Sequence, residues 1–185
     1  MLTDEDIIQG CKQGDRRAQQ ELYLKYGQKM YGYCLRYSGN VEDANDLLQD
    51  GFVKVFEFIG SYKGDSYLEA WMTRLFINLA ISRFRKRNTG PRFVEVEDAF
   101  LADKAVEQAD DNSLETFSVD RVLSALMELP DKYRMVINMY AIDKMSHKEI
   151  ASQLGVTEGA SKSILSRGRT MLKDHLMKNE KDKNR

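Results

Sequence analysis

The sequence has little of what a disulfide or a zinc centre requires. Its 185 residues include only two cysteines, Cys11 and Cys34, and neither stands in a Cys-x-x-Cys pair or near the two histidines, His147 and His175. Structural zinc sites need closely spaced Cys and His ligands, so we expect no metal. The two thiols are expected to be semi-buried side chains of helices, and no other pattern suggests a cofactor.

Long apolar runs are also missing. The strongest apolar stretch, residues 75–81, is interrupted by Asn78 and is far shorter than the roughly 20 residues that cross a bilayer. The opening residues MLTDED are acidic and lack the basic region and apolar run of a secretory signal. We therefore expect no membrane insertion and a cytoplasmic location.

Groups that carry covalent chemistry are scarce as well. The sequence offers no nucleophile paired with a base, no cluster of metal ligands and no glycine-rich phosphate loop. Strand patterns are nearly absent, whereas helix signals occur along most of the chain. These observations disfavour an enzyme, although a helical enzyme is kept as one alternative.

Charge is nearly balanced overall but unevenly distributed. The net charge is −1, yet residues 1–91 carry 13 basic and 12 acidic side chains, residues 92–120 carry 2 and 9, and residues 121–185 carry 13 and 8. A basic last third that follows an acidic stretch points to a polyanion as the partner of that last third.

Apolar periodicity predicts four helices in the first 91 residues. The third runs over about 42–58, and the loop 61–66 follows it. The fourth runs over about 67–87 and is expected to bury Trp71, Leu75, Ile77, Leu79 and Ile81.

The remainder of the chain predicts an acidic linker and a second helical domain. Residues 92–118 lose the periodicity and gather acidic side chains, as a flexible linker does. Four further helices are expected over about 119–129, 131–143, 147–154 and 158–178. The predicted fold is therefore all-α, with an N-terminal helical bundle over 1–91 and a C-terminal helix-turn-helix domain over 119–185.

Residues 146–173, SHKEIASQLGVTEGASKSILSRGRTMLK, carry the signals of that helix-turn-helix. Ser146 and Glu149 form a capping box, residues 154–156 supply a tight turn around a glycine, and Thr157 caps the second helix. Small or apolar residues gather on one side of this second helix, namely Ser161, Leu165, Gly168 and Leu172.

The other side of the second helix offers hydroxyls and cations. In a helix-turn-helix this helix lies in the major groove, with one face packed on the domain and the other against bases and phosphates. An ordinary solvated face is the alternative for the polar strip, but the two caps and the glycine turn together favour DNA binding. The candidate DNA ligands are Lys162, Ser163, Ser166, Arg167, Arg169 and Thr170.

Three stretches together resemble the extracytoplasmic-function (ECF) group of bacterial RNA polymerase sigma factors, in the family's own order. Residues 129–173 resemble its promoter-reading domain, EDANDLLQDGFVKVFE at 42–57 resembles its polymerase-binding segment, and YLEAWMTRLFINLAISRFRKR at 67–87 resembles its strand-opening helix. The resemblance implies a protein without covalent chemistry that binds core RNA polymerase and directs initiation at specific promoters. It would read the minus 35 element as duplex and the minus 10 element once melted. The resemblance also implies an anti-sigma factor as a further partner.

The resemblance also assigns residues to these contacts. Asp46, Gln49 and Asp50 match polymerase-contact positions, and their spacing places them together on the exposed side of a helix, where a plain acidic surface is the alternative. The loop 61–66 would receive an unstacked base, and the helix after it would lie against the melted strand. The minus 10 candidates are Tyr62, Lys63, Asp65, Ser66, Arg74, Asn78, Arg83, Arg85 and Lys86.

Two departures from the family pattern affect the promoter-reading helix. Ile164 stands where the family usually carries arginine or glutamine, and an apolar side chain at that edge can touch a thymine methyl group but cannot make a bidentate contact. Gly168 stands where alanine is usual and costs the helix up to about 1 kcal/mol. A free-standing helix-turn-helix regulator, which would bind operator DNA without polymerase, is the second alternative.

Overall fold

A computed structural model describes residues 2–64, 67–88 and 117–183, with side chains described as far as residue 178. All regular structure in these ranges is helical, so the all-α prediction is confirmed. The chain divides into two compact units, Met1–Ser82 and Arg83–Arg185, and the cut falls within a single continuous helix. The predicted domain limits stay a prediction, because residues 89–116, which include most of the acidic stretch, lie outside the described residues.

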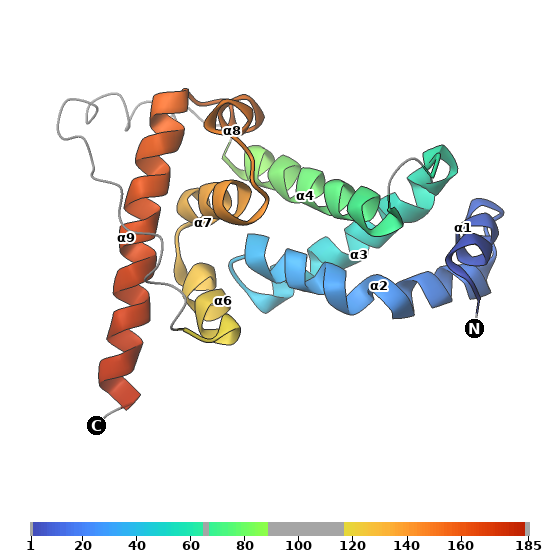
Figure 1. Cartoon of the computed structure of the whole chain (residues 1–185), viewed down its shortest axis with the longest axis horizontal. Coiled ribbons are helices and arrows are strands. Elements are labelled where there is room, and N and C mark those ends of the chain that lie inside the picture. The colour runs from blue at the N-terminus through green and yellow to red at the C-terminus, as the bar shows by residue number, and fades with distance from the viewer. Residues whose placement is uncertain (1, 65–66, 89–116, 184–185) are drawn as a thin grey trace. The chain divides into compact units, whose positions relative to one another are not determined.

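The first unit is formed by helices that begin where the sequence offers a cap. Thr3 makes a capping box with Asp6, and the side chains of Asp15 and Asn40 accept hydrogen bonds from backbone N–H groups of the next two helices. A 3₁₀ turn follows the third helix directly. The α-helices of this unit, shown in Figure 1, are α1 (Asp4–Lys12), α2 (Arg16–Tyr37), α3 (Val41–Phe58) and α4 (Leu68–Arg87).

Aromatic rings join three of these helices, two of the rings being buried and that of Tyr23 exposed. The Phe52 ring of α3 lies 4.8 Å from the Tyr23 ring of α2 and 5.6 Å from the Phe76 ring of α4, centre to centre. Gly51 makes this approach possible, because a Cβ atom there would lie only 2.1 Å from a ring carbon of Phe76. An ion pair of 2.7 Å between Lys29 and Glu69 joins α2 to α4 at the surface.

The buried face of α4 differs from the prediction. Of the five residues expected to be buried, only Ile81 is, and the rest are half-exposed. Apolar residues occur on nearly every side of this helix, so periodicity alone could not select the face that the other helices cover. The residues that are buried lie mostly at intervals of four, namely Leu68, Met72, Phe76, Ala80, Ile81 and Phe84.

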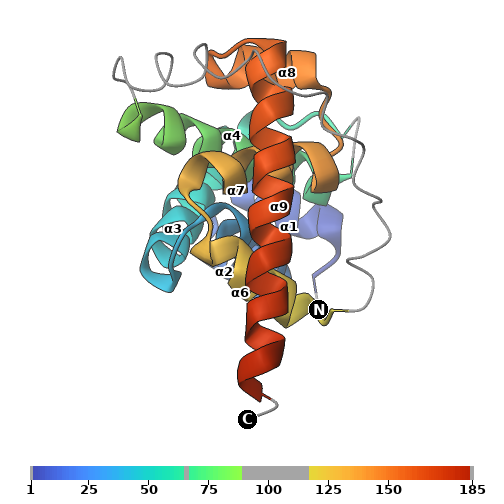
Figure 2. The ribbon, with the colours of Figure 1, turned by 90° about the vertical axis from the view of Figure 1, so that its left-hand side faces the viewer.

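In the second unit a long helix supports shorter ones. Figure 2 shows α9 (Glu158–Lys183) running past α6 (Val119–Glu128) and α7 (Asp131–Ile137), and both pack against it. A π-helical turn, η4 (Asn138–Ile142), ends α7, and α8 (His147–Leu154) follows. The predicted helices are confirmed, with α9 five residues longer than expected and the predicted helix 131–143 divided into an α part and a π part.

Two polar contacts and one glycine fix the helices of this unit to one another. The buried guanidinium of Arg134 donates to the backbone carbonyls of Met127 and Leu129, at 3.1 and 2.6 Å, and so satisfies the C-terminal end of α6. His175 of α9 pairs with Glu128 of α6 at 2.8 Å.

The glycine lets α9 approach α7 closely. A Cβ atom at Gly168 would lie 3.0 Å from Ile137 Cδ1 and 3.2 Å from Tyr133 Cβ. The helix-propensity cost predicted for this glycine therefore has a structural purpose.

Candidate functional site

The second unit contains the helix-turn-helix that the sequence predicts. Ser146 and Glu149 form the capping box of α8, and Gly155 ends the helix with a left-handed φ of 71°. The hydroxyl of Thr157 accepts a hydrogen bond of 3.1 Å from the backbone N–H of Ala160 and so caps α9. Helices α8 and α9 are therefore joined by the turn expected for this motif.

Helix α9 separates a packed face from a polar strip. Ser161, Leu165, Gly168 and Leu172 are buried, as predicted. The predicted DNA ligands all reach the surface: Lys162, Arg167 and Thr170 are exposed, whereas Ser163, Ser166 and Arg169 are half-buried. We define the polar strip of α9 as these six residues. Their surface position is compatible with DNA binding, and their individual roles stay predictions.

The expectation for Ile164 is wrong. Its side chain has no exposed surface, so it belongs to the core and cannot meet a thymine methyl group. It continues the packed face of α9 one turn after Ala160, which is also buried. Angular position alone placed Ile164 near the border between the two faces, and the packing of neighbouring helices around it widens the buried side.

Helix α8 is held against α9 by one histidine. His147 Nδ1 lies 2.9 Å from the hydroxyl of Ser161, which has no exposed surface. The imidazole also stacks on the ring of Tyr140, with centres 4.5 Å apart and planes inclined by 22°. Sequence reasoning assigned His147 no role, and only its place in the first turn of α8, facing α9, reveals one.

The stability of this unit is expected to depend on the charge of His147. Burial lowers the pKa of His147 below its ordinary value of 6.5; Lys162 lowers it further, Glu158 opposes this, and Arg169 adds to the lowering. The folded state therefore favours the neutral ring. Stability is present above pH 6.5 and is lost as the pH falls toward the lowered pKa.

Replacing this histidine gives a direct check. We expect the free energy of unfolding of the second unit, followed by far-UV circular dichroism, to decrease between about pH 7 and pH 5. His147→Phe, which keeps an aromatic ring against Tyr140 but cannot titrate, should reduce that decrease. An unchanged pH dependence in His147→Phe would show that other groups cause it.

In the first unit, the predicted polymerase contacts share one surface. Asp46, Gln49 and Asp50 are all exposed on α3, on the side opposite Leu47 and other buried residues of that helix. One turn further, Val53 is 54% exposed and extends the same stripe. An apolar side chain among carboxylates is typical of a docking surface, where it supplies buried area while the acids supply orientation.

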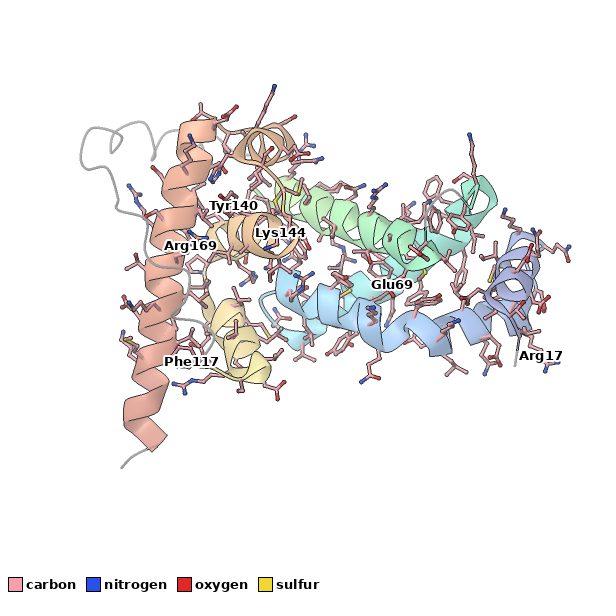
Figure 3. The ribbon with its side chains drawn as sticks, viewed as in Figure 1. Arg17, Glu69, Phe117, Tyr140, Lys144 and Arg169 are labelled. Carbon is pink, nitrogen blue, oxygen red and sulfur yellow. The ribbon has the colours of Figure 1, made fainter. Side chains whose placement is uncertain are left out.

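A hollow lies beside the loop predicted to receive a base. Its lining comes from α1, α2, the loop and the start of α4, namely Asp4, Ile8, Tyr26, Tyr62, Gly64, Tyr67, Leu68, Glu69 and Ala70. Glu69, labelled in Figure 3, marks its α4 side. Three tyrosines and two carboxylates make this surface suitable for a planar, hydrogen-bonding ligand.

Two tyrosines of the hollow differ in what they can offer. Tyr62 is only 8% exposed, its ring lies 5.4 Å from that of Trp71, and its carbonyl accepts a hydrogen bond of 2.9 Å from Lys12 Nζ. Tyr67 is 88% exposed. The sequence prediction named Tyr62 and omitted Tyr67, although an aromatic residue directly after the loop predicted to receive a base was the available signal.

The remaining minus 10 candidates lie along the loop and α4. Arg74 and Asn78 are exposed one turn apart, Arg85 and Lys86 are exposed near the end of the helix, and Arg83 is half-buried. Lys63 is exposed in the loop, whereas Asp65 and Ser66 lie outside the described residues.

The described residues offer neither a metal centre nor a membrane span. No group of three or more ligating side chains there could hold a metal ion. None of the described helices combines the length and the apolar character that a bilayer crossing needs.

Comparisons with known proteins match both units to one family. The family model for sigma-70 region 2 matches residues 22–89, and the model for sigma-70 region 4 matches residues 120–172. The chain is 30% identical over 178 residues to the ECF RNA polymerase sigma factor SigW of Bacillus subtilis, covering 91% of this chain and 94% of that protein. It is 28% identical over 179 residues to the RNA polymerase sigma-H factor of Pseudomonas aeruginosa, covering 91% and 93%.

A solved structure is also similar. The sigma factor RpoE of Bartonella quintana, crystallised with the anti-sigma factor NepR, superposes with a TM-score of 0.49 and 25% identity over 85% of this chain and 96% of that chain.

Proposed function

Because the chain belongs to the ECF group of RNA polymerase sigma factors, we propose that three separate surfaces contact the minus 35 duplex, the polymerase and the melted minus 10 strand. As a member of this family it binds core RNA polymerase and directs promoter-specific transcription. In our proposal it acts in the cytoplasm, performs no covalent chemistry and is held in check by an anti-sigma factor.

The first contact is made by the polar strip of α9 with the minus 35 duplex. The observation that carries this assignment is the division of α9 into a fully packed face and a strip of cations and hydroxyls, on the second helix of a helix-turn-helix. Arg167 is exposed and has the fork of donors that pairs with both acceptors of a guanine. Lys162 and Thr170 lie beside it as phosphate ligands.

The second contact is made by α3 with the polymerase. Asp46, Gln49, Asp50 and Val53 are exposed on one side of a helix whose other side is fixed in the core. Because α3 is rigid, its carboxylates would meet a basic partner surface without losing much conformational freedom.

The third contact is made at the hollow beside the loop 61–66, where an unstacked minus 10 base would lie against Tyr67. Removing a base from its stack costs a few kcal/mol. Stacking on an exposed aromatic ring returns about 1–3 kcal/mol of that cost. Arg74 and Asn78 of α4 would continue the contact along the melted strand.

In assays with reconstituted polymerase, three variants of the full chain should each impair a different step. We expect Asp46→Lys/Asp50→Lys to weaken binding to core enzyme at least about tenfold, since like charges at an interface cost several kcal/mol. Tyr67→Ala should bind core normally but open the promoter more slowly. Arg167→Ala should bind core enzyme and open the promoter normally but lose about 1–3 kcal/mol of discrimination among minus 35 sequences.

The three readouts are core-binding affinity, permanganate reactivity of melted thymines and competition among promoter sequences. Lys178→Ala is the matched control for Arg167→Ala, because Lys178 is an exposed cation of the same helix about three turns beyond Arg167. Unaltered promoter choice in Arg167→Ala would refute its role. Tight promoter binding without core enzyme would instead support a free-standing regulator.

A further inference from the structure

Arg169, at the edge of the polar strip, lies over an aromatic pair. Its guanidinium carbon is 5.7 Å from the centre of the Tyr140 ring, within the range of a cation–π contact. The other neighbour of Tyr140 is His147, stacked at 4.5 Å and bonded to the buried hydroxyl of Ser161. Arg169, Tyr140 and His147 therefore form one column that begins at the surface and ends in the core between α8 and α9.

The backbone under this column is unusual. Tyr140 belongs to the π-helical turn η4, in which the N–H of Asp143 bonds to the carbonyl of Asn138 at 2.9 Å. π-helical turns are rare and are frequently found at functional sites. Lys144 follows with a left-handed φ of 59°, which is uncommon outside glycine. Two irregular backbone features therefore lie at or near Tyr140, the residue whose ring Arg169 contacts.

The column also borders a hollow. Tyr140, Lys144 and Arg169 lie close together beside α9 in Figure 3 and line a depression with Ala141, Met145, Ser146 and Glu149. The ammonium of Lys144 donates to the carbonyl of Ala141 at 2.7 Å, so it points along the backbone. The hollow thus has a basic edge formed by two side chains that are both held in place.

We propose that Tyr140 and His147 are positioning residues, which hold Arg169 ready to contact a DNA phosphate at the edge of the minus 35 element. This inference rests on the proposed function of α9. A long side chain loses conformational freedom when it binds, and this loss reduces affinity. A guanidinium already held on an aromatic face has lost part of that freedom before DNA arrives. His147 stacks on the same ring, and its own position is fixed by the hydrogen bond to Ser161.

A double-mutant cycle can test this coupling in holoenzyme made with the full chain. Tyr140→Leu keeps apolar bulk but removes the aromatic face, and we expect it to weaken binding to a minus 35 duplex roughly three- to tenfold. In the Arg169→Ala background the same Tyr140→Leu change should have almost no further effect. A merely structural role of Tyr140 would weaken binding equally in both backgrounds, and that result would overturn the proposal.

Two further variants, compared with Arg169→Ala, keep the test decisive if Tyr140→Leu folds poorly. Tyr140→Phe keeps the aromatic face and should bind DNA like the unmodified protein. Arg169→Lys keeps the charge but not the planar stack, so it should bind more weakly with an unchanged salt dependence, whereas Arg169→Ala should lower the slope of log affinity against log salt by about 1. Equal affinity of the Arg169→Lys and unmodified proteins would contradict the proposed holding role.

The outcome for Arg167 separates this inference from the function on which it rests. If Arg167→Ala changes promoter choice but Arg169→Ala leaves affinity and salt slope unchanged, the positioning role fails and the proposed function stands. If neither variant affects promoter binding, the assignment of α9 to the minus 35 element fails as well.

Discussion

Gly51→Ala is expected to destabilise the first unit by about 1–3 kcal/mol, although alanine favours helices over glycine. The added methyl group would lie 2.1 Å from the Phe76 ring. That ring is 1% exposed and is held edge-on against Phe52, so it has little space into which to move. Because interiors are close-packed, α3 and α4 would have to separate instead.

Tryptophan fluorescence can follow this effect during urea unfolding. Trp71 is the sole tryptophan of the sequence and lies in α4, so its signal reports on the first unit. Gly32→Ala is the matched control, since Gly32 lies within α2 and a Cβ atom there would meet nothing within 4 Å. It should raise stability by up to about 1 kcal/mol. Effects of the same sign in both variants would mean that helix propensity, and not packing, governs Gly51.

The same packing links the core to the docking surface. Gly51 is buried and directly follows the exposed Asp50 on α3, so a displacement of α3 would move the carboxylates proposed to meet the polymerase. We therefore expect Gly51→Ala to weaken core binding although it changes no surface residue. The measurement of core affinity described for Asp46→Lys/Asp50→Lys would detect this.

Local signals were sufficient for most helix boundaries. Thr3, Asp15 and Ser146 each accept a backbone hydrogen bond at the first turn of a helix, as their sequence context predicts. Gly155 takes the left-handed conformation that the turn requires. These features depend on residues a few positions apart, so the sequence specifies them without knowledge of the tertiary fold.

Features set by distant residues were harder to predict. Helix α4 is apolar on several sides, and only its neighbours decide that Met72 and Phe76 are buried while Trp71 is half-exposed. The π turn at Tyr140 has no pattern of its own, because its residues continue an ordinary helical sequence. Tyr67 was not among the candidates although it directly follows the loop, and its 88% exposure beside a hollow depends on the fold of the whole unit.

The sequence predicted the position of the polar strip of α9, whereas the roles of its individual residues stay predictions. The polar strip of α9 was located correctly because a 26-residue helix keeps its angular order along its length. The burial of Ile164 at its edge was not predicted, because it depends on the helices that pack around that residue. Tertiary contacts, such as that of Arg169 with Tyr140, therefore decide how the residues at the border of the strip are placed.

Ile164→Ala distinguishes the two accounts of that border. A side chain that only touched a thymine methyl could be shortened without loss of stability, and promoter affinity alone would decrease. A side chain with no exposed surface leaves a cavity instead, and we expect the free energy of unfolding of the second unit to decrease by about 2–5 kcal/mol. Far-UV circular dichroism would show a second-unit transition at lower urea, while Trp71 fluorescence, which reports on the first unit, would be unchanged.

Lys162→Ala is the matched control two residues earlier on α9. Its side chain is exposed, so its removal should change stability by no more than about 0.5 kcal/mol while it weakens promoter binding. If Ile164→Ala is as stable as the unmodified protein, Ile164 does not belong to the core and its side chain faces DNA instead. If Ile164→Ala is destabilised, position 164 supports α9 from within the core. A base contact made by arginine or glutamine at this position in a relative then cannot be assigned to this chain.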